Sequence, residues 1–166
     1  PMVVKELERI GVKVHLHQPK NQFDVLHLHS PLPDSFLWAL RARKAGKPVV
    51  VHGRHLPELV KGGFIGGSLM YPIARAYSVG FYNQGTVVLG ATPYVCKSLE
   101  KDGVRGPFKV IHNGINREVF MRDDALGAKF RERWGVKDSD KLVLSVGLRI
   151  PRKGVDTFVN MSEDLK

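Results

Sequence analysis

The sequence contains little cysteine, few acidic residues and no long apolar run. Cys96 is the single cysteine of the 166 residues, so a disulfide within the chain is excluded and a reducing compartment is indicated. Apolar stretches such as Val49 to Val51 fall far short of the roughly 20 residues that a membrane-spanning helix needs. The N-terminus shows no signal-peptide pattern. We therefore expect a cytoplasmic protein that is soluble, or that lies on a membrane surface rather than across it.

Two common nucleotide-binding motifs are also absent. No G-x-x-x-x-G-K-[ST] loop occurs, and the paired glycines of "GGFIGG" (residues 62–67) do not follow an expected strand. This argues against a Walker loop and against the glycine fingerprint of a dehydrogenase. The glycines instead predict a mobile loop that exposes Phe64, which would suit a lipid interface. An ordinary tight connection explains the same loop.

Positive charge is abundant and unevenly distributed. The formal net charge is +10, and residues 35–97 contain eight cations but one acid, Glu58. The cations are Arg41, Arg43, Lys44, Lys47, Arg54, Lys61, Arg75 and Lys97. Such a segment favours an anionic lipid surface or a nucleic acid, and a solvated basic face without a partner is the third alternative. Because aromatic residues are not interleaved with the cations, a nucleic-acid partner is disfavoured.

Hydrophobic periodicity alternates between strand and helix along the chain. A composition of 43% apolar residues is enough for one sizeable core. Expected strands are residues 12–17, 23–30, 47–53, 85–91, 108–114 and 141–147. Helices are expected at residues 2–11, from a cap at Asp34 or Ser35 to Gly46, at residues 69–82, from a cap at Thr92 to Gly103, at residues 123–135 and after Gly154. This alternation predicts an α/β fold, a Rossmann-like parallel sheet with helices on both faces.

Ligands of such sheets bind beyond the carboxyl ends of the strands, so the residues that follow each expected strand are the first candidates for a site. Histidine, arginine and glycine recur there. These positions are His29 and Ser30, His52 to His55, Gly90 to Thr92, His112 to Gly114, and Gly147 to Arg149.

Two H-x-H pairs suggest a metal site as an alternative. His15 with His17, and His27 with His29, each place two imidazoles on one face of an expected strand. Four imidazoles on neighbouring strands could bind zinc. No cysteine or obvious carboxylate completes the set, and hydrogen-bonded histidines are commoner. We therefore predict no metal site.

The stretch "VGLRIPRKG" (residues 146–154) is a candidate for binding phosphate groups. Gly147 permits close approach of the backbone after an expected strand. Arg149, Arg152 and Lys153 supply positive charge, and a helix is expected to begin near Gly154. Together these features suit a diphosphate. A solvated basic turn is the alternative.

Five segments, in this order, resemble the retaining glycosyltransferases of family GT4. They are "FDVLHLHSPLP", "GKPVVVHGRH", "FYNQGTVVLGATPYVCKSLEKDGV", "FKVIHNGINREVF" and "LVLSVGLRIPRKGVDTF". Within the family, the segments most resemble glycolipid synthases that glucosylate diacylglycerol. The resemblance implies a GT-B architecture, in which an N-terminal Rossmann-like domain binds the acceptor and a second domain binds the sugar nucleotide. Residues 1–134 would form an incomplete acceptor domain, 135–140 a linker, and 141–166 the truncated start of the donor domain.

The resemblance also implies roles for single residues. We expect His52 and His55 as catalytic candidates, and the acceptor-binding candidates are His29, Arg54, Phe64, Asn113 and Gly114. The candidates for the donor diphosphate are Gly147, Arg149, Arg152 and Lys153.

Three positions depart from the family pattern. Leu148 stands where the family has an arginine, Arg54 stands where related synthases have a second histidine, and Asn116 replaces an aspartate. Arg149 follows one place after Leu148 and would point to the other face of a strand, so we expect Lys153 to make the stronger diphosphate contact.

The implied reaction transfers a hexose, with retention, from a nucleotide diphosphate sugar such as UDP-glucose to a hydroxyl acceptor. We expect a membrane lipid as acceptor, no metal requirement, and a peripheral location on the inner face of the cell membrane. The family's two glutamates separated by seven residues are missing, so we predict that this chain alone is inactive. A non-catalytic half that binds membranes or a partner remains an alternative, as does a basic nucleic-acid-binding protein.

Overall fold

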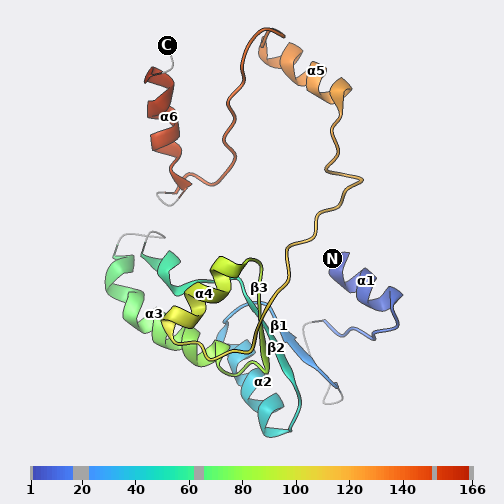
Figure 1. The fold of residues 1–166 in the computed structure, drawn as a ribbon, viewed down its shortest axis with the longest axis vertical. Coiled ribbons are helices and arrows are strands. Elements are labelled where there is room, and N and C mark those ends of the chain that lie inside the picture. The colour runs from blue at the N-terminus through green and yellow to red at the C-terminus, as the bar shows by residue number, and fades with distance from the viewer. Residues whose placement is uncertain (1, 17–22, 62–65, 151–152, 165–166) are drawn as a thin grey trace.

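A computed structural model of the chain describes residues 2–16, 23–61, 66–150 and 153–164 (Figure 1). Four short strands alternate with helices, and two further helices follow. In chain order the elements are α1 (Met2–Arg9), β1 (Leu26–Leu28), α2 (Pro33–Lys44), β2 (Val49–Gly53), the 3₁₀ helix η1 (Pro57–Val60), α3 (Gly67–Tyr82), β3 (Val87–Gly90), α4 (Pro93–Asp102), β4 (Phe108–Val110), α5 (Asp124–Trp134) and α6 (Val155–Asp164). Among the described helices, none has the length and apolar composition needed to cross a bilayer.

The four strands form one parallel sheet in the order β1-β2-β3-β4. Leu26 is paired with Val49, Val50 with Val87, and Val88 with Phe108. This confirms the predicted Rossmann-like parallel sheet. Because each strand pairs with the one before it, right-handed crossovers place the connecting helices on the same face.

The core lies between that face and the helices. Alternate residues of β1 and β2 are buried, and they pack against α2, α3 and α4. The buried apolar residues include Leu26, Leu28, Ala39, Ala42, Val49, Val51, Phe81, Tyr82, Val88 and Leu99. The intervening residues His27 and His52 lie on the opposite face and retain solvent access. The predicted second layer of helices is not found among the described residues, so this face of the sheet is open.

Helix boundaries follow local signals in the sequence. The predicted cap of α4 is confirmed, since the Thr92 hydroxyl accepts a hydrogen bond from the backbone N–H of Val95 at 3.3 Å. Gly103, with a φ of 105°, ends the same helix in the left-handed conformation. Helix α2 begins at Pro33, slightly before the predicted cap at Asp34 or Ser35. Proline tolerates this first helical position because its missing N–H has no partner there.

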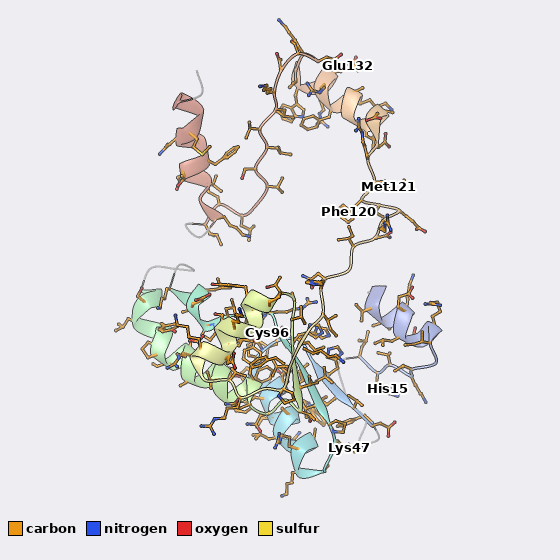
Figure 2. The ribbon with its side chains drawn as sticks, viewed as in Figure 1. His15, Lys47, Cys96, Phe120, Met121 and Glu132 are labelled. Carbon is orange, nitrogen blue, oxygen red and sulfur yellow. The ribbon has the colours of Figure 1, made fainter. Side chains whose placement is uncertain are left out.

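The C-terminal third of the chain differs from the sheet region. Helices α5 and α6 lie apart from the sheet in Figure 1, and Figure 2 shows Phe120 and Met121 on the segment that leads to α5. The helix expected after Gly154 is confirmed as α6.

Two predicted strands are not formed in the described residues. Residues 141–147 are extended but unpaired, with Val143 60% and Val146 87% exposed. Residues 12–16, the described part of the first predicted strand, are also irregular. A strand requires a neighbour to satisfy its backbone groups, and among the described residues neither segment is paired with a strand.

Candidate functional site

Three histidines meet at the carboxyl end of β1 and β2. The register pairs His27 with Val50 and Leu28 with Val51, so His29 and His52 are the next neighbours along the two strands. The ring centroids of His27 and His29 are 4.5 Å apart, those of His27 and His52 4.8 Å, and those of His29 and His52 4.6 Å. We call these residues the histidine trio. All three rings lie on the open face of the sheet.

The surroundings of the trio disfavour protonation. Two causes together lower the pKa of both His27 and His52 to about 4. Partial desolvation is the larger, and the positive charges of neighbouring histidines and of Arg54 add to it. Desolvation and Arg54 also lower the pKa of His29. Near pH 7 the trio is therefore neutral, and each ring has one donor and one acceptor nitrogen.

The loop after β2 holds the next two candidates, Arg54 and His55. Both side chains are exposed. The backbone of His55 is fixed by Tyr82, whose hydroxyl accepts from the His55 N–H at 3.3 Å and donates to the His55 carbonyl at 2.9 Å. Tyr82 is fully buried, and desolvation raises the pKa of its hydroxyl to about 12. A buried phenol in the core therefore positions the loop that follows His52.

The segment after β4 contributes a second group of candidates. His112 Nδ1 lies 3.0 Å from the Ala91 carbonyl, which ties the end of β4 to the end of β3. Asn113 and Gly114 follow this contact and are exposed. Phe64, the predicted acceptor contact from the glycine-rich loop, lies outside the described residues.

The donor candidates lie in the segment between α5 and α6, apart from the sheet (Figure 1). Arg149 forms an exposed ion pair with Asp156 at 3.4 Å. A Cβ added at Gly147 would lie 3.7 Å from the side chain of Lys153, so these two residues are close together. Arg152 lies outside the described residues. The structure thus brings His29 and His52 together beside the charge of Arg54, but it does not bring the donor candidates to them.

Sequence reasoning did not place His27 among the site residues, although the structure puts it in the trio. His27 belongs to the H-x-H pair His27/His29, which the sequence pattern grouped with His15 and His17 as a possible zinc site. In the structure the third imidazole comes from His52, while His15 is exposed and His17 lies outside the described residues. The correct grouping required the β1–β2 register, which the sequence pattern alone does not contain.

The fold agrees with that of a known family. A family profile described as Glycosyltransferase Family 4 matches residues 4–119. The chain belongs to this family. Four of the five segments that suggested it lie wholly or largely within the match, including both histidine-bearing strands.

Two curated relatives in this family carry glycolipid names. The processive diacylglycerol alpha-glucosyltransferase of Acholeplasma laidlawii is 21% identical over 162 residues, covering 97% of this chain and 47% of the relative. The alpha-galactosylglucosyldiacylglycerol synthase of Streptococcus pneumoniae is 24% identical over 147 residues, covering 86% of this chain and 38% of the relative. The chain therefore spans less than half the length of either relative.

A solved structure confirms the fold. The crystal structure of Anabaena HepE in complex with UDP and glucose superposes with a TM-score of 0.53 at 16% identity, covering 68% of this chain and 29% of that one. The likeness supports the predicted GT-B type of Rossmann-like domain.

Proposed function

We propose that this chain is the acceptor-side part of a family 4 glycosyltransferase that transfers a hexose from UDP-glucose or a related nucleotide sugar to a lipid hydroxyl, with retention. The observation that carries the proposal is the histidine trio at the carboxyl edge of β1 and β2, inside the family match. The names of both curated relatives support a glycolipid product. UDP and glucose bound to the Anabaena structure support the donor class.

His52 is proposed to orient the acceptor hydroxyl. A pKa of about 4 keeps its ring neutral, so one nitrogen can accept a hydrogen bond from the hydroxyl that attacks the sugar. His29 lies beside it and can contact a second hydroxyl. Arg54 and His55, which directly follow β2 and are exposed, are also proposed to contact the acceptor. Asn113 and Gly114, which follow β4 on the far side of β3, would line its other side.

The donor diphosphate is proposed to bind Gly147, Arg149, Arg152 and Lys153. The positive charges of Arg149, Arg152 and Lys153 would offset the negative charge that develops on the leaving diphosphate. Such charge stabilisation is the usual form of electrostatic catalysis in these reactions. Arg149 is exposed and paired with Asp156 at 3.4 Å, so diphosphate binding would replace a weak surface ion pair. We propose no metal for this step.

A membrane surface is the proposed source of the acceptor. Helix α3 exposes Leu69, Met70 and Ile73, with 84%, 45% and 65% of their surface accessible. Two exposed cations belong to the same region: Lys61 Nζ lies 3.9 Å from the centroid of the Tyr71 ring on α3, and Arg75 on α3 is paired with Asp102 at 3.2 Å. Each cation near an anionic lipid surface contributes about 1 kcal/mol. Phe64, which lies outside the described residues, stays a proposed acceptor contact.

The test uses the natural polypeptide that contains this sequence, purified and supplied with UDP-glucose and vesicles containing diacylglycerol. We expect an alpha-linked glucolipid, identified by mass spectrometry and by its NMR coupling constants. His52→Ala should lower kcat/KM at least about a hundredfold, since correct handling of the acceptor proton contributes about that much. The matched control is His15→Ala, which changes an exposed histidine outside the trio.

Two results would contradict the proposal. One is the absence of transfer to any lipid acceptor with any nucleotide sugar. The other is a His52→Ala variant as active as the His15→Ala control. The 166-residue chain assayed alone should show no transfer. If the longer polypeptide were inactive yet bound anionic vesicles, the non-catalytic membrane-binding alternative would replace the enzyme.

A further inference from the structure

The histidine trio has a second chemical capacity besides the acceptor contacts proposed above. A metal ion would occupy the same nitrogens of His29 and His52, so it would compete with the acceptor for the site. Ring nitrogens of His27, His29 and His52 that could bind one ion all lie within 4.8 Å of one another. Among the described residues this is the one group of three or more histidine, cysteine, aspartate or glutamate side chains with such spacing. The arrangement follows from the sheet, because two strands supply the rings from a shared face.

The donor set selects a class of metal. Three neutral imidazoles suit zinc, copper and nickel, whereas magnesium and calcium prefer oxygen ligands. Three protein ligands with one open position are the pattern of zinc sites that keep a water or substrate in the fourth position. We propose that His27, His29 and His52 form a binding site for a divalent transition metal, with zinc as the probe ion. This inference rests on the geometry of the trio and does not depend on the proposed transfer reaction.

Rotation of the side chains would allow the three rings to bind one ion. Zinc–nitrogen bonds of about 2.0–2.1 Å place the nitrogens of a tetrahedral site roughly 3.4 Å apart. His27 and His29 are exposed, so their side chains can rotate toward His52 without disturbing the core. The rings are stacked or tilted, with interplanar angles of 17° to 33°, so each ring must turn before its nitrogen lone pair points at a shared ion. The open face leaves the fourth position to water.

One neighbouring charge opposes a cation. Arg54 lies close enough to lower the pKa of every member of the trio, so its charge also repels a metal ion. Its side chain is exposed and can turn into solvent. Because Arg54 repels a cation, Arg54→Ala should strengthen metal binding rather than weaken it.

The experiment is a zinc titration of the untagged, metal-free chain by isothermal calorimetry at pH 7.5. We expect one zinc ion per chain, no competition from magnesium, and binding weakened at least about tenfold in His27→Gln, His29→Gln and His52→Gln. His15→Gln and His112→Gln are matched controls and should bind as the unchanged chain does. Arg54→Ala should tighten binding roughly a few-fold. Circular dichroism verifies that each variant retains its helices.

A measurement on the unchanged chain keeps the test independent of folding. Copper bound to the trio should show coupling to several imidazole nitrogens in its electron paramagnetic resonance spectrum. The proposal is overturned if the spectrum shows no nitrogen coupling, if no zinc binds, or if His15→Gln weakens binding as much as His27→Gln does.

Discussion

Two similar stretches of sequence behave differently in this chain. "KPVVVHG", residues 47–53, contains the central strand β2, in which Val49 and Val51 are fully buried. "KLVLSVG", residues 141–147, has the same lysine, apolar run and final glycine, yet Val143 is 60% and Val146 87% exposed. The first stretch has β1 on one side and β3 on the other. The second has no paired neighbour among the described residues.

The difference shows that strand formation here depends on partners more than on residue preference. Every buried apolar residue of the described chain lies between Leu26 and Val104, and α5 has none. Helices α5 and α6 form because their hydrogen bonds are internal to the helix. A β-branched segment cannot satisfy its backbone groups internally in this way, so it forms a strand only beside another strand.

The largest expected difference in stability is between the loss of a buried phenylalanine and the loss of an exposed one. Phe81 is fully buried and packs against Phe36 and Tyr82, whereas Phe120 is 72% exposed (Figure 2). Phe81→Ala should lower the free energy of unfolding by about 3–5 kcal/mol, and Phe120→Ala by less than about 0.5 kcal/mol. Urea unfolding followed by circular dichroism measures both. Equal losses would mean that residues 111–166 share the core of the sheet.

An intermediate effect is expected from two glycines. A Cβ at Gly90 would lie 2.4 Å from the sulfur of Cys96, whereas one at Gly127 in α5 would meet nothing within 4 Å. Gly90→Ala should destabilise the sheet region by about 1–3 kcal/mol through overpacking. Gly127→Ala should instead raise the helicity of α5, since alanine favours a helix by about 1 kcal/mol over glycine.

Urea unfolding and the far-ultraviolet circular dichroism signal separate these two outcomes. Adding Cys96→Ala to Gly90→Ala removes the clashing sulfur and should restore part of the stability. A double variant no more stable than Gly90→Ala would show that the predicted clash is not the cause.

The smallest expected effect is a pH dependence confined to the sheet region. The pKa of His27 and of His52 is about 4 in the folded chain, against about 6.5 in the unfolded chain. The unfolded state therefore binds more protons between these values, and the free energy of unfolding should fall as the pH drops from about 6.5 to 4. Because the rings are partly exposed, solvent screening limits the loss to about 1 kcal/mol or less.

Urea titrations at pH 7.5 and pH 5 measure this dependence. The double variant His27→Gln and His52→Gln should lose less stability between the two pH values than the unchanged chain. His15→Gln is the control and should lose as much as the unchanged chain. A double variant with an unaltered pH dependence would show that the trio does not titrate as proposed.

The parts of the fold that local signals determine could be predicted from the sequence. The Thr92 cap, Gly103 and the apolar period of α4 specify that helix without reference to any other segment. The β-branched run at 49–51 and the alternating pattern at 26–29 similarly indicated β2 and β1. The same signals failed at 12–16 and 141–147, because local pattern does not state whether a partner strand is present.

The candidate site was predictable to a similar extent. The rule that ligands bind beyond strand ends selected His29 and His52, and the structure places their rings 4.6 Å apart. His27 was missed because its inclusion depends on which strands are neighbours and in which register. The role of Tyr82 could not be anticipated either, since its hydroxyl reaches His55 across 27 sequence positions through the packing of α3.

The sequential strand order also bears on how the chain folds during synthesis. Strand β2 emerges from the ribosome when β1 is already available, and β3 and β4 each find their partner already made. None of the four described strands is inserted between two strands that precede it in the chain. Domains that fold from the N-terminus during translation expose fewer unpaired edges to aggregation. A nascent chain that has released Gly53 thus already holds the template for β3, and β3 then becomes the template for β4.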